Sequence, residues 1–218
     1  MRTQTAFAFA GAIFAGIVAT GSAMAAVTFT STPFYTGSYS APPLDVTFDG
    51  ASASGYSYTY TDAGIYSGAG GLVSGVAAPP VGDTTNFLAV YGGGTATLTT
   101  PLLESMSVYI GSVDSYNTIS FYNGGALVGS FTGTQLLAPL PAAANGDQSS
   151  ALTNRTFDFN FGNTPVNEVV FSSSGNSFEF DNVAGAAVPE PGVWFLLLTG
   201  FTVLGTALRL GKPSAAAA

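Results

Sequence analysis

The chain has 218 residues and a formal net charge of −8, only 7% of its residues are charged, and it contains neither cysteine nor histidine. Without these two residue types it can form no disulfide, no Ser–His–Asp or Cys–His catalytic group, and no zinc site built on His or Cys. Arg155 is the only basic residue between residues 26 and 188, so this acidic stretch would repel a phosphate backbone, and nucleic-acid binding is excluded.

Residues 1–25 have the features of a secretory signal peptide. Arg2 supplies a positive charge ahead of an apolar stretch of small residues over 6–18. Ala23 and Ala25 satisfy the small-x-small rule for cleavage, which leaves Ala26 as the new N-terminus. The alternative is an uncleaved anchor helix, which the shortness of the apolar stretch disfavours.

Residues 26–185 have the composition of an all-β domain. Short runs of β-branched and aromatic residues alternate with Gly, Ser, Asn and Pro, and no stretch keeps a 3.6-residue apolar period over three turns. Strands are predicted over residues 27–30, 46–48, 56–60, 65–66, 87–91, 95–99, 107–111, 118–122, 127–131, 156–161, 168–172 and 177–183. So many short strands in ~160 residues favour a two-sheet, jelly-roll-like sandwich over a closed barrel.

Three features of this β region can be predicted more closely. Asn123-Gly124-Gly125 tolerates positive φ, so strands 118–122 and 127–131 are expected to form a hairpin. In 156–161 three phenylalanines alternate with polar residues and are expected to face the core. Residues 63–86 are rich in Gly, Ala and Pro and are expected to form a long irregular connection.

A short motif and an apolar segment follow the β region, within residues 186–213. Val188-Pro189-Glu190-Pro191 precedes residues 192–208, which are interrupted only by threonines and glycines. As a helix, that segment would be about 26 Å long, at the short end for a transmembrane helix in a ~30 Å hydrocarbon core. Arg209 and Lys212 end the segment before a tail at 214–218, and they place the C-terminus on the cytoplasmic side.

This combination resembles a PEP-CTERM sorting signal, which occurs on bacterial proteins that also carry a signal peptide. The resemblance implies recognition by exosortase, a membrane-embedded cysteine transpeptidase-like enzyme, with cleavage near the motif. The residues that carry it are Val188, Pro189, Glu190, Pro191, Trp194 and Arg209. The family usually ends in a run of arginines, so the basic end here is thinner than its pattern.

The resemblance implies a set of partners and a cellular location. The implied partners are exosortase, the secretion machinery and, before processing, the membrane; the implied destination is the outer cell surface or an extracellular matrix, often within exopolysaccharide. Independently, two prolines bracket Glu190 and fix φ near −65°, which gives an extended, preformed recognition segment. The alternative is a plain C-terminal anchor with a proline-rich hinge.

The β region also resembles, more loosely, a β-sandwich group carried by exosortase-dependent surface proteins. The similar stretches are residues 82–88, 116–124 and 178–183. That group implies no catalytic activity.

Glu179 and Asp181 form a candidate catalytic pair. They are two residues apart and therefore on one strand face, about 6.6 Å apart along the strand. Paired carboxylates can hydrolyse glycosidic bonds. The alternative is a solvated strand face, with Phe178 and Phe180 on the core side, and this alternative is favoured.

Two further sets of side chains suggest binding. Carboxylates that could include the ligands of a structural calcium ion are Asp45, Asp49, Asp62, Asp83, Asp114 and Asp181. Tyr56, Tyr58 and Tyr60 share a face and could stack on sugars, although packing in or beside the core is the favoured interpretation.

The sequence therefore predicts an exported, non-enzymatic β-sandwich, flanked by a signal helix and a transmembrane helix and sorted by its C-terminal signal. The alternatives are a carbohydrate-binding or adhesive module of an exopolysaccharide matrix, and a carboxylate glycosidase. No catalytic residue, metal ligand or cofactor is assigned, and structural calcium stays an open alternative.

Overall fold

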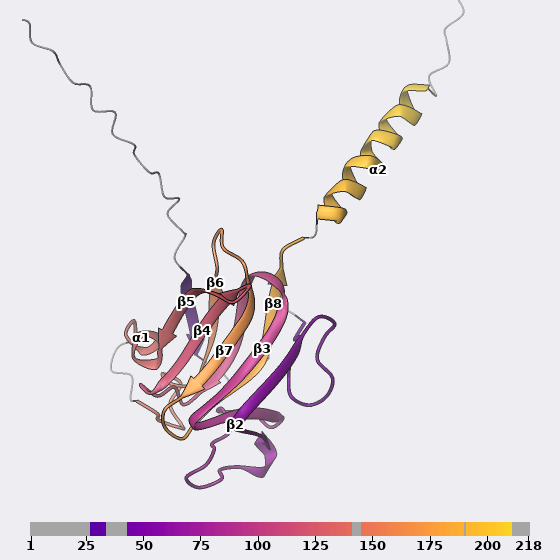
Figure 1. The fold of residues 1–218 in the computed structure, drawn as a ribbon. Helices are drawn as coiled ribbons and strands as arrows, with labels where there is room; N and C mark the ends of the chain where they lie inside the picture. Colours follow the sequence, from indigo (N-terminus) through magenta and orange to yellow (C-terminus); the bar gives the residue numbers. More distant parts are fainter. Residues whose placement is uncertain (1–26, 34–42, 141–144, 190, 211–218) are drawn as a thin grey trace, which may run out of the picture.

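The computed structural model describes residues 27–33, 43–140, 145–189 and 191–210. The predicted signal peptide, with the cleavage residues Ala23, Ala25 and Ala26, lies outside the described residues, as does the tail 214–218. In chain order the elements are β1 (Thr28–Pro33), β2 (Ser57–Ser67), the 3-10 helix η1 (Gly68–Gly70), β3 (Asn86–Gly111), β4 (Asn117–Asn123), β5 (Ala126–Thr132), α1 (Gly133–Leu137), β6 (Arg155–Asn160), β7 (Val166–Ser173), β8 (Phe178–Ala187) and α2 (Pro191–Leu210). The described part of the chain before α2 is mostly β-sheet, which agrees with the predicted all-β class, and its two helices, η1 and α1, are short (Figure 1).

Strand β3 is the longest element, and four other strands pair with it. It has 26 residues and is antiparallel to β2, β6, β7 and β8. The prediction of three separate strands in this region is wrong, because the glycines at 92–94 bend the strand without ending it. Gly93 has a φ of 86°, and Gly94 lies so close to β2 that an added Cβ would be 2.8 Å from the carbonyl oxygen of Thr61.

The bend in β3 curls the sheet onto itself. The strand order is β1-β6-β3-β7-β4-β5, with β2 and β8 also paired to β3. Strand β8 lies between the two ends of β3, because Phe180 pairs with Leu88 on one side and with Ile110 on the other. The curl brings β7, β4 and β5 opposite β8, β6 and β1.

Aromatic side chains from the two halves of the curled sheet meet in the core. Phe171 of β7 stacks on Phe180 of β8 with ring centroids 3.8 Å apart. Phe121 of β4 meets Phe159 of β6 at 4.8 Å. The three phenylalanines of residues 156–161 are at most 1% exposed, which confirms their predicted orientation.

The predicted hairpin is also confirmed. Strands β4 and β5 are antiparallel, with Thr118 opposite Thr132 at one end of the ladder and Asn123 opposite Ala126 at the other. Gly124 and Gly125, which connect them, have φ values of 56° and 81°, the left-handed region that glycine adopts at little cost.

The C-terminal end of the sheet connects directly to the apolar segment. Strand β8 extends to Ala187, beyond the predicted strand 177–183, and the N–H of Val188 still donates to the carbonyl of Leu102 at 2.7 Å. Helix α2 then begins at Pro191 and stands away from the sheet (Figure 1). Among the residues that the structure describes, no helix is long and apolar enough to cross a membrane, so the predicted transmembrane helix is not confirmed.

Replacing Phe171 with alanine tests the core between the two halves of the sheet. Phe171 is fully buried, so Phe171→Ala should lower the free energy of unfolding by about 3–5 kcal/mol. Leu127→Ala is the matched control, because Leu127 is 57% exposed on β5 and its loss should change stability by about 0.5 kcal/mol or less. Urea unfolding measures both, and equal effects would contradict this description of the core.

Candidate functional site

Residues 71–85, called here the covering loop, lie across one face of β8 and of the C-terminal part of β3. The N–H of Ala78 donates to Glu179 Oε1 at 3.0 Å, and the hydroxyl of Tyr109 donates to the carbonyl of Val81 at 2.6 Å. A Cβ added to Gly111 would lie 2.9 Å from the ring of Pro80. Of the irregular connection predicted over residues 63–86, residues 63–67 instead belong to β2. Residues 71–85 are irregular as predicted and form a second layer over the sheet.

The covering loop buries the predicted carboxylate pair. Glu179 is 2% exposed and Asp181 is 0% exposed, so the interpretation of this face as solvated is wrong. Phe178 and Phe180 face the core as predicted. The alternation along β8 predicts correctly which side chains face the core. The opposite face of the strand is also buried, because the covering loop lies on it.

Glu179 is held by three donors. Oε1 accepts from the N–H of Ala78 and from the hydroxyl of Ser177, and Oε2 accepts from the hydroxyl of Ser112 at 3.2 Å. Burial nevertheless raises the pKa of Glu179 above its usual value, because desolvation outweighs the hydrogen bonds that favour its charge. Its oxygens are engaged by the protein.

A cavity of about 150 Å³ opens beside Glu179, between the covering loop and the sheet. Its polar lining includes Asp114, Tyr116, Ser112 and Ser177, and its apolar side is formed by residues 72, 73 and 75–78 of the covering loop. Carboxylate and hydroxyl groups beside an aromatic ring can hold a small polar ligand such as one sugar unit.

Asp114 and Tyr116 are the residues of this cavity that sequence reasoning did not bring to Glu179. Asp114 is 9% exposed, and burial raises its pKa. The hydroxyl of the neighbouring Tyr116 donates its one proton to the carbonyl of Asn176 at 2.6 Å. No local pattern signals this cavity, because its residues come from separate strands and loops.

The predicted pair of Glu179 and Asp181 does not form one site. Glu179 lines the cavity, whereas Asp181 lies beside Thr85, with 3.3 Å between Asp181 Oδ2 and the Thr85 hydroxyl, and is not among the cavity residues. Two carboxylates that hydrolyse a glycosidic bond must flank it together. This arrangement does not support the proposed carboxylate pair.

The aspartates considered as calcium ligands are dispersed. Asp45 accepts from the N–H of Gly185 at 2.7 Å, and Asp49 accepts from the N–H of Asn86 at 2.8 Å. Asp62 is exposed at the bulge of β2. No group of three or more His, Cys, Asp or Glu side chains that could hold a metal ion occurs in the described ranges. The two remaining aspartates, Asp83 and Asp181, adjoin each other.

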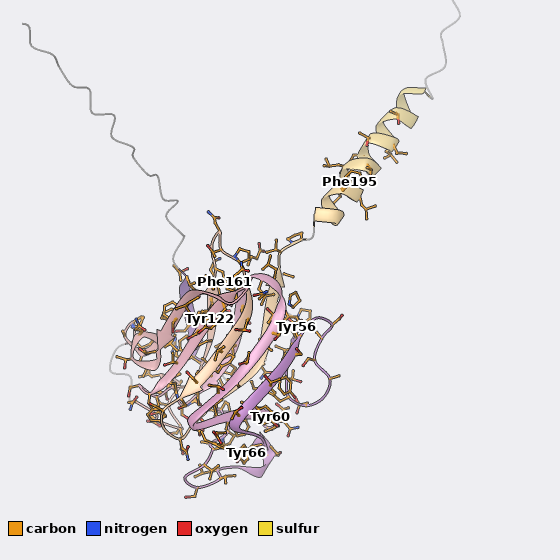
Figure 2. All side chains as sticks on the ribbon, viewed as in Figure 1. Tyr56, Tyr60, Tyr66, Tyr122, Phe161 and Phe195 are labelled. Carbon is orange, nitrogen blue, oxygen red and sulfur yellow. The ribbon has the colours of Figure 1, made fainter. Side chains whose placement is uncertain are left out.

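Of the three tyrosines at 56, 58 and 60, the first precedes β2 and the other two lie in it. Tyr56 and Tyr58 are half-buried, and Tyr58 packs edge-on against Phe48 with ring centroids 5.0 Å apart. Tyr60 stacks on Tyr58 at 6.4 Å but is 44% exposed (Figure 2). Tyr56 and Tyr58 therefore pack against the core, whereas the ring of Tyr60 is exposed to solvent.

The predicted sorting residues lie where β8 ends and α2 begins. Val188 is tied to β3, and Pro189 is exposed. Glu190 lies outside the described residues, whereas the backbone of Pro191, Trp194 and Arg209 belongs to α2.

Comparison with known proteins assigns no family. No family model and no curated protein matches the chain. Among solved structures, it is similar to a mutant of the family 29 carbohydrate-binding module CBM29-2 (11% identity, 77% of this chain and 93% of that chain, TM-score 0.37). It is also similar to the K2 cleaved adhesin domain of Lys-gingipain (12% identity, 73% of this chain and 98% of that chain, TM-score 0.35). A third similar structure is the family 11 carbohydrate-binding module of Lic26A-Cel5E of Clostridium thermocellum (16% identity, 70% of this chain and 99% of that chain, TM-score 0.19). All three TM-scores are below 0.5, so these likenesses carry neither a fold family nor a function.

The raised pKa of Asp114 predicts a pH dependence of stability. A folded pKa above the unfolded value of about 3.9 means that the contribution of Asp114 is complete below that pH and is lost as the pH rises through the folded pKa. The free energy of unfolding should therefore fall as the pH rises above about 4, and it should fall less in Asp114→Asn. Urea unfolding at a series of pH values measures the difference.

Asp147→Asn is the control for this measurement. Asp147 is partly exposed, and its hydrogen bonds from Ser149 lower its pKa. Its contribution therefore has the opposite sign, and its removal should leave the fall as steep or steeper. Identical pH profiles for the wild-type protein and Asp114→Asn would contradict the prediction.

Proposed function

We propose that this chain is an exported, non-enzymatic surface or extracellular-matrix protein with a jelly-roll-like β-sandwich body. Residues 188–210 act in it as the core of a sorting signal for exosortase. The observation that carries the proposal is the exposure of the apolar side chains of α2, directly after the Pro-Glu-Pro motif.

Residues 195–206 of helix α2 contain no charged side chain, and their only polar side chains are three threonines. Its most exposed large apolar residues are Phe195, Leu196, Leu198, Phe201, Val203 and Leu204, each between 63% and 72% exposed (Figure 2). Its threonine hydroxyls donate to carbonyls three and four residues earlier, so these polar groups are satisfied within the helix. A helix with this many exposed apolar side chains is stabilised by an apolar environment, and these side chains are not buried against the body.

The position of the motif supports a detachable signal. Every strand of the body ends at or before Ala187, and the last backbone bond to the body comes from Val188. Cleavage within residues 189–191 would therefore remove α2 without removing a strand. A signal that is read at the membrane and then discarded needs this separation.

A second candidate function, carbohydrate binding by the body, has its own supporting observation. The cavity beside Glu179 combines the Asp114 carboxylate with the ring and hydroxyl of Tyr116. Sugar hydroxyls pair with carboxylates, and the apolar face of a sugar ring packs on aromatic rings. Because the oxygens of Glu179 are engaged by three donors, the cavity fits binding better than hydrolysis.

Replacing the motif carboxylate tests the sorting proposal. In cells that contain exosortase, Glu190→Ala should leave the C-terminal segment attached and keep the protein in the membrane fraction. Intact mass and cell fractionation measure both effects. Glu104→Ala is the matched control because Glu104 is an exposed residue of β3, and it should be processed like the wild-type protein. Normal processing of Glu190→Ala would sink the proposal.

A glycan array tests the second function. If a glycan binds, Tyr116→Ala should weaken its binding at least about tenfold, through loss of stacking and of a hydrogen bond. Tyr122→Ala serves as the control, because Tyr122 lies on β4 and is not among the cavity residues. A blank array, with and without calcium, or equal binding by both variants, would rule out this function for the cavity.

A further inference from the structure

Two carboxylates face each other at the edge of the covering loop. Asp83 belongs to the loop and Asp181 to β8, and the hydroxyl of Thr85 lies between them, 2.6 Å from Asp83 Oδ1 and 3.3 Å from Asp181 Oδ2. A hydroxyl has a single proton, so it can donate at full strength to only one of them. The shorter distance assigns that proton to Asp83.

The other oxygen of each carboxylate lacks a hydrogen-bond donor. Asp83 Oδ2 and Asp181 Oδ1 are both buried and find no N–H or hydroxyl donor, and these are the only two such side-chain atoms among the described residues. The two carboxyl groups lie close enough to hydrogen-bond each other when one of them is protonated. Asp181 as a whole is 0% exposed. A buried carboxylate oxygen is normally hydrogen-bonded or coordinated to a cation, because otherwise its desolvation is uncompensated.

The local charge makes the lack of a counter-ion more costly. Asp49 also contributes negative charge near this pair. Burial, followed by the charges of Asp83 and Asp49, raises the pKa of Asp181 to about 8, and burial raises the pKa of Asp83 as well. A divalent cation between the two carboxylates would remove this penalty.

We propose that Asp83 and Asp181 bind a calcium ion that fastens the covering loop to β8. The donors are all oxygens, which suits a hard cation and excludes the nitrogen and sulfur ligands that zinc prefers. Two carboxylates with the Thr85 hydroxyl, completed by water, suit the irregular shell of calcium better than the strict octahedron of magnesium. The ion would also stabilise the cavity, since Glu179 lies two residues before Asp181 and residues 72–78 belong to the same loop.

Thermal unfolding of the full-length chain in detergent tests the site. At pH 7.5, millimolar CaCl₂ should raise the Tm by about 5 °C or more over the value in EDTA, and Asp83→Asn and Asp181→Asn should abolish this rise. Asp158→Asn should retain it, because Asp158 is an exposed residue of β6. A Tm that is the same in EDTA and CaCl₂, a rise that survives in both variants, or an equal rise with MgCl₂ would overturn the proposal.

A direct measurement covers the case in which the variants do not fold. Terbium binds at calcium sites and luminesces when a nearby tyrosine is excited, and Tyr109 pairs with Asp181 across the β3–β8 ladder. The wild-type chain should show sensitised terbium emission that saturates at one ion per chain and is displaced by calcium. Absence of emission, or emission that calcium does not displace, would mean that the two carboxylates share a proton instead of a cation.

Discussion

The structure depends most on the position of β8 between the two ends of β3. This arrangement closes the curl of the sheet, and it brings Phe180 of β8 against Phe171 of β7. It also gives the covering loop a surface on which to lie. Without it, the core aromatics would not meet, and Glu179 and Asp181 would be ordinary solvated carboxylates.

The covering loop removes the carboxylates of Glu179 and Asp181 from solvent. The carboxylates of Asp45, Asp49 and Glu179 are satisfied by backbone N–H groups and hydroxyls. The pair of Asp83 and Asp181 differs from them, because each retains a buried oxygen without an N–H or hydroxyl donor. A chain without cysteine and histidine has only oxygen ligands with which to bind a cation, and it places two of them where a loop must be held to a strand.

The body and the C-terminal helix differ in how their apolar side chains are placed. The body buries its aromatic residues between the halves of one curled sheet, and its last strand remains paired up to Ala187. Helix α2 exposes its apolar residues and satisfies its threonine hydroxyls internally. Because these two parts meet at a motif of only a few residues, removal of the helix would leave the pairing of the body unchanged.

The sequence by itself determined the all-β class, the β4–β5 hairpin and the inward phenylalanines of β6, because period-two alternation and turn glycines are local signals. It also contained the Pro-Glu-Pro motif, whose role stays a prediction. Only the tertiary structure decided that residues 86–111 form one bent strand, that both faces of β8 are covered, and that Asp114 and Tyr116 join Glu179. The physical reason is that these features depend on contacts between residues far apart in the chain, and alternation within a strand cannot show what lies above it.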